Sequence, residues 1–556
     1  MRAPLRLTAL LLATLLPCVA TRPLAAQGTL LFTEDAAPVP QGMLRVRVIP
    51  GWERTSDRFT GQGSATQPLG AIRSSAAFGA SESPALRPIE GALQVLTGDA
   101  NFRLSLGAAT TTASTRTVVM PLMLEYGLTR RITLSANVPI VRWRAQVAMR
   151  SDSTSWRSQL AMRLAGTGPN VGIASQVQAQ QLAAAQQQLE ASITALTNAL
   201  TQCQSSSTAP GCGAINGNRA GAQALLTSIT GYRDAVGTLL RTPSATFALL
   251  PGSAASAMTA RVAALNAEYR GFLGTDALSA PLPLAAGRAG VGDYRDFLLD
   301  AGNPFGPDTI GWSRGMALGD VELGARMVVV DRWLPRRSAA RGDTVPIPAF
   351  GWRLSAGALA RLGTGTAPSG RQFDDPGTGD GQTDVEGSAL VDMRLGSRFG
   401  ATAVARYTAQ LGEVADAGFA SSAGGAITPV AAVGTTHSLG NVMAVELSPR
   451  VFINEALSVD GHYGFERRGA DTYHFAPPDD QSLANWVSSI DVAGYNVQRA
   501  GVGFTYSTLR AWERGMVNFP VELSWTHFET IRASAAVPKG TRDLISLRIY
   551  YRLLGR

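Results

Sequence analysis

Short segments in which apolar and polar residues alternate are the feature that most constrains how this chain folds. Residues 381–410 read GQTDVEGSALVDMRLGSRFGATAVARYTAQ. Side chains in a β-strand point alternately to opposite faces, so Val385 and Leu395 share one face, and Asp384 and Asp392 share the other. A short turn, GSRF, follows, and the alternation then begins again. The pattern predicts two antiparallel strands joined by a tight turn, each with one apolar and one charged face.

The same alternation recurs along the chain and predicts twelve strands. Short connections such as YGLTRR, GSRF and INEA alternate with long ones at 54–114, 145–316, 364–381, 412–436 and 469–493. Bacterial membrane barrels have an even number of antiparallel strands, short periplasmic turns and long external loops. We therefore predict an all-β fold, an antiparallel transmembrane β-barrel with both termini in the periplasm. The predicted strands are MLRVRVIPGW, TVVMPLMLEYG, RITLSANVPIVRW, GDVELGARMVVV, GWRLSAGALARLG, DVEGSALVDMRL, FGATAVARYTAQ, NVMAVELSPRVF, LSVDGHYGFERR, YNVQRAGVGFTYST, NFPVELSWTHFE and RDLISLRIYYRLL, with 103–114 interpreted as loop or as the start of the following strand.

A soluble β-sandwich has the same alternation, with its apolar face as the core. Two further features favour the membrane barrel. Residues 1–26 combine Arg2 and Arg6 with an apolar run and small residues, which predicts a secretory signal peptide. Aromatic residues stand near the strand ends, as in the girdles that flank the apolar band of membrane barrels. They are Trp52, Tyr126, Trp143, Trp352, Tyr407, Tyr495, Trp525 and Tyr551.

The distribution of charge excludes one class of partner. The net charge is +8, but the Arg residues are scattered through the alternating segments and form no basic run. A nucleic-acid-binding surface needs a basic patch, so we expect no nucleic-acid partner. We expect the lipid of the bacterial outer membrane instead.

Residues 145–316 form the longest connection and have a different pattern. An apolar residue recurs at every seventh position from Leu182 to Cys203, which predicts a helix with a coiled-coil-like stripe. Apolar residues at helical spacing continue through 222–241 and 256–273. We therefore predict an insertion of two or three antiparallel helices whose stripes pack against one another.

Two cysteines, Cys203 and Cys212, lie outside the predicted signal peptide. In an exported chain such a pair predicts a disulfide, here near the tip of the first helical hairpin. The predicted organisation is a signal peptide at 1–26, the N-terminal part of the barrel at 27–144, the helical insertion at 145–316 and the C-terminal part of the barrel at 317–556.

The polar faces of the predicted strands carry acidic and basic side chains in nearly balanced numbers. A salt-bridge network that fills a narrow barrel explains such faces, and so does a pore whose charges set selectivity. Twelve strands enclose a wider lumen than the eight-stranded barrels that side chains fill, which favours a conduit, although loops or the helical insertion can plug it. The residues expected to line the lumen are Arg45, Arg47, Glu322, Arg326, Arg353, Arg361, Asp384, Glu386, Asp392, Arg394, Arg406, Glu446, Arg450, Asp460, His462, Glu466, Glu522 and Arg548.

We predict no catalytic residue, metal site or cofactor. The four histidines stand in no HExxH motif or Cys/His cluster. An outer-membrane lipid-modifying enzyme needs a Ser and a His on its lipid-facing surface, but His527 and Ser524 fall on opposite faces of their predicted strand. The run DDPGTGDGQTD offers carboxylates of the kind that bind Ca²⁺, although similar turns are common without metal.

Three stretches resemble the meta-pathway phenol-degradation-like family of outer-membrane proteins. They are MPLMLEYGLTRRITLSANVPIV, LGDVELGARMVV and GTGDGQTDVEGSALVDMRLGSRFGATAVARY, within 115–143 and 317–411. The resemblance implies a twelve-stranded barrel that takes up small, often aromatic or hydrophobic, compounds. The chain departs from the family pattern in its helical insertion and in ending YYRLLGR instead of on a terminal aromatic residue.

Three functions follow from these patterns as hypotheses. The first is passive passage of a small-molecule solute, hydrophobic or aromatic by the resemblance, through a charge-lined lumen. The second is a surface protein whose barrel anchors a helical binding head, and the third is a lipid-modifying enzyme. The site residues favour the first, and no pattern predicts an oligomeric state.

Overall fold

The structure is a computed structural model that describes part of the chain. The described residues are 34–61, 63–73, 75, 77–80, 86–151, 168–241, 246–290, 292, 312–333, 350–367, 377–412, 414–415, 435–475, 494–535 and 537–552. The predicted signal peptide at 1–26 lies outside the described residues, as do the last four residues of the chain.

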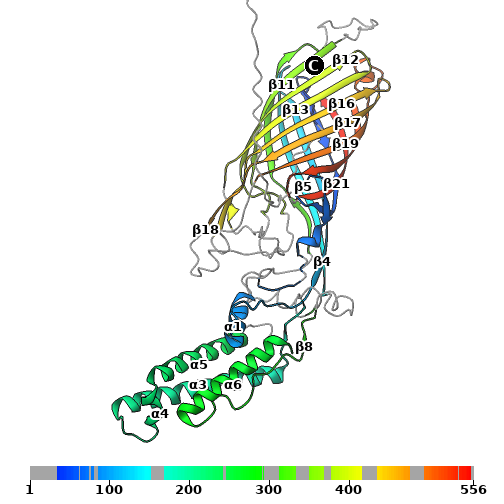
Figure 1. Cartoon of the computed structure of the whole chain (residues 1–556). Helices are drawn as coiled ribbons and strands as arrows, with labels where there is room; N and C mark the ends of the chain where they lie inside the picture. The colour runs from blue at the N-terminus through cyan, green and yellow to red at the C-terminus, as the bar shows by residue number, and fades with distance from the viewer. Residues whose placement is uncertain are drawn as a thin grey trace, which may run out of the picture.

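The described strands close into a twelve-stranded antiparallel barrel, which confirms the predicted fold class (Figure 1). β1 and β2 follow each other between the same two neighbours, β4 and β21, and count as one strand, as do β9 and β10 beside β5. The first strand meets the last through pairs such as Leu44 with Tyr551, so the sheet has no free edge. The strands are β1 (Met43–Val48) with β2 (Gly51–Phe59), β4 (Ala109–Gly127), β5 (Ile132–Ser151), β9 (Trp312–Leu318) with β10 (Val321–Asp331), β11 (Phe350–Leu362), β12 (Asp384–Leu395), β13 (Phe399–Gln410), β16 (Val442–Phe452), β17 (Leu457–Arg468), β19 (Tyr495–Ser507), β20 (Val521–Ala533) and β21 (Pro538–Arg552).

The outer surface of this wall is apolar. In β12, Val385 and Leu395 are 44% and 61% exposed, whereas Asp384 is completely buried. The side chains that point away from the barrel therefore form the surface suited to lipid, and closure of the wall pairs the backbone groups that lipid cannot satisfy. This architecture is that of a bacterial outer-membrane protein. None of the described helices is both long enough and apolar enough to cross a bilayer.

Two of the aromatic residues expected in the girdles lie elsewhere. Trp143 is 2% exposed and packs with Val141 and Ala145, and Tyr495 is also buried, in a cluster with Val497. Trp143 is an odd-numbered residue of β5, the face opposite to outward-pointing Leu134, so the alternation itself directs its side chain away from lipid. The interpretation as girdle residues is wrong for these two positions.

Strands β4 and β5 are much longer than the others and continue beyond the barrel toward the helices (Figure 1). β4 begins at Ala109, so residues 109–114 belong to this strand. β5 continues to Ser151, inside the expected helical insertion. The run of outward apolar residues in β5 ends near Ile140, because only the part facing lipid needs them. Beyond it the outward positions are polar, as at Arg142, Arg144 and Gln146, whereas Val141, Trp143 and Ala145 on the other face remain apolar.

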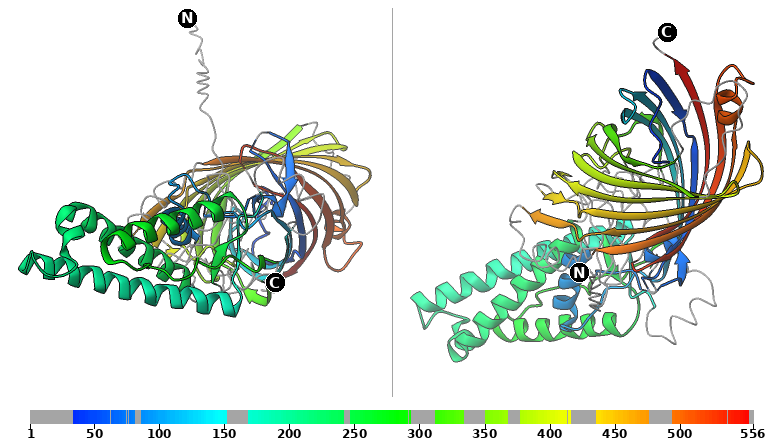
Figure 2. Two further views of the ribbon diagram at one scale, coloured as in Figure 1. Left: turned by 60° about the horizontal axis from the view of Figure 1, so that its bottom comes forward. Right: turned by 90° about the horizontal axis from the view of Figure 1, so that it is seen from above.

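Apart from α9 (Leu509–Glu513), the described α-helices lie together outside the barrel, at the end opposite to the C-terminus (Figures 1 and 2). The three expected helices are present as α3 (Gln176–Ser205), α5 (Arg219–Leu240) and α6 (Ser253–Leu273). A disulfide between Cys203 and Cys212 ties the end of α3 to the start of a short helix, α4 (Cys212–Gly217), which confirms the predicted pairing. The smaller elements are β3 (Thr66–Pro68), the 3-10 helix Leu69–Arg73, β6 (Val171–Ile173), β7 (Phe247–Leu249), β8 (Gly287–Arg288), β14 (Val414–Ala415), β15 (Thr435–Ser438), β18 (Thr472–Phe475) and α9 (Leu509–Glu513).

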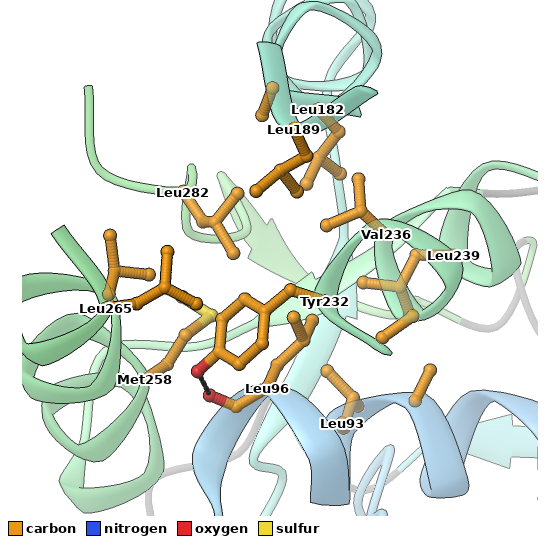
Figure 3. Packing of buried hydrophobic residues seen from close by; sticks show 14 of the residues in the cluster. Leu93, Leu96, Leu182, Leu189, Tyr232, Val236, Leu239, Met258, Leu265 and Leu282 are labelled. Carbon is orange, nitrogen blue, oxygen red and sulfur yellow. Dashed lines mark hydrogen bonds between the residues drawn. The ribbon is translucent and has the colours of Figure 1, made fainter. Parts of the chain in front are cut away.

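A further helix from another connection completes the same core. α1 (Arg87–Thr97) lies in the connection between β2 and β4, and its Leu93 and Leu96 are buried with the leucines of α3 and Tyr232 of α5 (Figure 3). We call α1 and α3 to α6 the helical head. The core of the head therefore includes residues of the connection between β2 and β4 in addition to the helices of the expected insertion 145–316.

Tyr232 joins these two loops through a hydrogen bond. Its hydroxyl donates to the carbonyl oxygen of Leu96 over 2.7 Å (Figure 3). Burial raises the pKa of Tyr232 to about 12, so the hydroxyl keeps its proton and remains a donor near neutral pH. The bond satisfies a carbonyl group at the buried end of α1.

Replacing Leu93 by Ala is expected to destabilise the helical head by about 2–5 kcal/mol, because the smaller side chain leaves a cavity in its core. Limited proteolysis of the membrane-inserted protein should then cleave α3 and α5 faster. Val95→Ala, on the exposed side of α1, is the control and should have a much smaller effect. Equal protease resistance of L93A and the native chain would show that α1 is not part of this core.

Candidate functional site: the barrel interior

The charged face of the strands points into the barrel. Asp384, Glu386 and Asp392 of β12 are 0%, 1% and 6% exposed, and their neighbours in sequence point outward. The same alternation buries Arg45 and Arg47 of β1. Of the residues expected inside, those classed as buried are Arg45, Arg47, Arg361, Asp384, Glu386, Asp392, Arg406, Glu446, Asp460 and His462, and the other eight are half-buried.

Near the end of the barrel that holds the C-terminus, Glu125 of β4 is the centre of a cluster of arginines. Both of its carboxylate oxygens accept hydrogen bonds from Arg45, over 2.5 and 2.6 Å. Guanidinium nitrogens of Arg47 and Arg326 each lie 3.6 Å from this carboxylate. One buried carboxylate therefore faces three cations, so it must contribute strongly to the cohesion of the wall at this level.

Two further arginines connect strands in the other half of the barrel. Arg406 of β13 lies 3.4 Å from Glu386 and 3.3 Å from Glu446, on the strands to either side. Arg361 of β11 donates to Glu322 of β10 and to Asp384 of β12, each over 3.0 Å. Each guanidinium thus bridges carboxylates on both neighbouring strands, as its fork of donors allows.

Residues 34–40, which precede the first strand, lie inside the barrel and are called the internal segment. Asp35 pairs with Arg548 of β21 over 2.9 Å, and Glu34 pairs with Arg406 over 3.2 Å. Arg326 donates to the carbonyl oxygen of Asp35 over 2.7 Å. The segment thus has ionic contacts with opposite parts of the wall.

Backbone hydrogen bonds and apolar packing hold the same segment. The Ala36 amide donates to Asp392 over 2.9 Å, and the Ser355 hydroxyl donates to the Ala36 carbonyl over 2.7 Å. Ala36 also packs against Leu390 and the equally buried Val404. Together with the bond from the Val39 amide to Thr133, these contacts connect the segment to β5, β10, β11, β12, β13 and β21, so it crosses the interior.

The remaining expected residues have polar partners in the interior or at its ends. Arg394 differs from the rest, because its Nε donates to the Gly396 carbonyl over 3.1 Å and its guanidinium lies over the ring of Phe452 at the short turns. The other pairs are Arg450 with Asp460, Glu466 with Arg499 at 2.8 Å, His462 with Ser448 at 2.9 Å, Glu522 with Tyr550 at 3.0 Å and Arg353 with Asp331 at 3.2 Å.

Three residues at the centre of this arrangement were not among the sequence-predicted set. Glu125 stands on the polar face of its strand between Leu124 and Tyr126, so the alternation contains the signal that identifies it. Glu34 and Asp35 precede the first strand in a stretch without periodicity. Their position depends on cations far away in the sequence, and no local signal indicates it.

The histidine considered for lipid chemistry lies on the outer face. His527 Nδ1 is 2.9 Å from Asp543, and Val502 is its partner on the other neighbouring strand. Ser524 is on the opposite face of β20, so the described residues place no serine hydroxyl beside this histidine. The arrangement does not supply the serine nucleophile that such an enzyme requires.

The acidic loop considered for Ca²⁺ is held by protein contacts. Asp320 accepts hydrogen bonds from the amides of Gly365 and Asp380, over 2.7 and 3.0 Å. Residues 368–376, which include part of DDPGTGDGQTD, lie outside the described residues. Within the described ranges, no three His, Cys, Asp or Glu side chains gather closely enough to hold a metal ion.

Comparison with known proteins adds little beyond the fold. No protein-family model matches the chain, and no curated protein does, so the resemblance to the phenol-degradation-like family has no such support. A solved outer membrane channel from Pseudomonas putida F1 is 10% identical over 93% of this chain and 98% of its own, with a TM-score of 0.38. A Pseudomonas aeruginosa FadL homologue is 9% identical (92% and 90% covered, TM-score 0.23), and the Ralstonia pickettii toluene transporter TbuX is 8% identical (93% and 92% covered, TM-score 0.24). These identities and TM-scores are too low to carry an argument about function.

Proposed function

We propose that the protein is an outer-membrane channel through which small molecules pass passively, with the internal segment as its barrier. The observation that supports this most is the internal segment itself, which is held by ion pairs and hydrogen bonds that can break and re-form. If the segment served only to fill the barrel, we would expect mainly apolar packing between it and the barrel wall. The eighteen expected residues, together with Glu125, are proposed to line the path that opens.

The class of solute is proposed from the family resemblance alone. That resemblance favours small hydrophobic or aromatic molecules. The barrel interior is charged, so a hydrophobic solute would have to pass beside charged side chains. Most of these side chains are in ion pairs, and an ion pair exposes less charge than an unpaired side chain. Uptake of a set of aromatic, aliphatic and charged solutes into vesicles distinguishes between these classes.

A second proposal rests on the helical head. It has a hydrophobic core of its own, and it projects from the end of the barrel away from the short turns, which are periplasmic in bacterial barrels. A head on the cell surface is suited to binding an external partner, with the barrel as its anchor. The two proposals are compatible, because head and interior are separate parts of the chain.

Removing the helical head separates the two proposals. The variant replaces residues 78–106 and 172–287 by short Gly-Ser linkers, so that no apolar face of α1 is left uncovered. If the protein is a channel, solute flux into proteoliposomes should remain, and any binding to cell surfaces should be lost. Absence of flux from both this variant and the full chain, even after release of the internal segment, would contradict the channel.

A further inference from the structure

Three arginines stand side by side on the outer face of the barrel. In the strand register, Arg54 of β2 is directly opposite Arg116 of β4, and Arg116 is directly opposite Arg144 of β5. All three side chains are exposed. We call them the arginine row. The row is visible only in the register, because the three residues are far apart in the sequence.

The row carries a cost in the isolated protein. Like charges directly opposite each other on neighbouring strands destabilise a sheet, because their Cβ atoms are only about 4.5–5.5 Å apart. Of the outward carboxylates on the nearby strands, Asp543 pairs with His527 at 2.9 Å and Glu529 with Lys539 at 2.9 Å. Asp57, which is opposite Lys539 in the register, accepts a hydrogen bond from the Ser56 hydroxyl over 2.6 Å. Within the described ranges, no carboxylate pairs with any member of the row. An anion from outside the chain is the natural counter-charge.

The position of the row identifies the kind of anion. One row closer to the short turns, exposed Trp52 is opposite Val118, whose partner on β5 is exposed Arg142; Met120 and Ile140 follow on the apolar face. A tryptophan beside an apolar band marks the membrane–water interface. The arginine row therefore lies just beyond this band, at the level of lipid headgroups, on the side of the barrel that carries the helical head.

A recess adjoins the row. It has a volume of about 650 Å³, and Arg144 lines it together with residues that include Thr112, Ser114, Gln146 and Ser313. Hydroxyl and amide groups beside a guanidinium suit a ligand that has both phosphate and sugar hydroxyls.

We propose that the arginine row binds the phosphate groups of a phosphorylated glycolipid in the leaflet that faces the helical head. A guanidinium group binds phosphate oxygens through two parallel N–H donors. Three adjacent guanidinium groups can therefore bind more than one phosphate. The lipid would neutralise the repulsion within the row and fix the height of the barrel in the membrane. This inference rests on the placement of the barrel in the membrane and not on its function as a channel.

The test compares three full-length proteins in a neutral detergent. The row variant is R54Q/R116Q/R144Q. The matched control, R130Q/R131Q/R467Q, also removes three exposed arginines, two of them in the turn between β4 and β5 and one on the opposite side of the barrel. Heat-modifiable gel mobility first establishes that each barrel is folded. The probes are purified lipopolysaccharide, phosphatidylcholine and inorganic phosphate.

Lipopolysaccharide should raise the Tm of the native protein and of the control, and its affinity for the row variant should be lower by about a hundredfold. Phosphatidylcholine should not distinguish the three proteins. Without lipid, the row variant should be at least as stable as the native chain, because repulsion between the three arginines has been removed.

Equal affinity of row variant and control for lipopolysaccharide would overturn the proposal. So would an effect that inorganic phosphate reproduces in full, since the site would then bind a free anion. Solute flux is measured separately, so a failed channel leaves this result intact.

Discussion

Replacing Glu34 by Gln and Asp35 by Asn is expected to open the barrel. The two carboxylates, whose side chains are 21% and 24% exposed, pair with Arg406 and Arg548. Breaking a fully buried ion pair costs about 3–5 kcal/mol, and we take the lower end of this range for each of these half-buried pairs. A change of about 5.5 kcal/mol is enough to move a two-state equilibrium from 1:99 to 99:1. Loss of both pairs can therefore convert an internal segment that is mostly bound into one that is mostly released. Conductance in planar bilayers should rise well above that of the native chain.

The pore opened by these two replacements is expected to select between anions and cations. Removal of two interior carboxylates leaves Arg406 and Arg548 without these counter-charges, so the open pore should prefer anions. E190Q/D234N, which removes two acidic side chains of the helical head, is the charge-matched control and should conduct like the native protein. An unchanged conductance of E34Q/D35N in a correctly folded barrel would show that the internal segment is not the barrier.

Replacing Glu125 by Gln is expected to destabilise the barrel by about 3–5 kcal/mol, because three buried or nearly buried cations lose the carboxylate they share. Its partners are Arg45, Arg47 and Arg326. Denaturant unfolding in lipid vesicles, followed by the loss of heat-modifiable gel mobility, measures the effect. E190Q removes an exposed acidic side chain of α3 and should leave the unfolding midpoint unchanged.

A second replacement tests whether charge is the cause. If E125Q destabilises the barrel through the unpaired cation, adding Arg45→Gln should recover part of the lost stability, because the pair is then removed as a whole. Additive destabilisation by the two changes would indicate that Glu125 acts through packing and not through its pairing with Arg45.

Much of the barrel was predictable from the sequence because its physical constraint is local. A strand between lipid and interior must alternate, so Val385 and Asp384 are assigned to opposite faces without knowledge of any other strand. The heptad-spaced leucines from Leu182 likewise require a helix with a buried stripe. The disulfide was predictable because the chain is expected to be exported and its two cysteines are close together in the sequence. In each case the information lies within a few residues.

Other features depend on contacts between segments that are far apart in the sequence. The short helix α1 joins the core of the head because Leu93 and Leu96 meet helices from another loop. Glu34 and Asp35 lie in the barrel because cations on several strands attract them. Trp143 lies near a strand end, which favours a girdle position, but its place in the alternation directs it to the other face.

The sequence by itself therefore determined the strands, which face of each strand is apolar, the helices of the longest loop and the disulfide, since alternation and helical spacing are properties of neighbouring residues. Only the tertiary structure decided what occupies the barrel and which charges meet. Arginines that are far apart in the sequence connect neighbouring strands inside the barrel, and three others form the arginine row outside it. Which arginines meet depends on the register between strands, and closure of the whole wall sets that register. The free energy of charge pairing depends on that register, and a linear sequence of residues does not contain it.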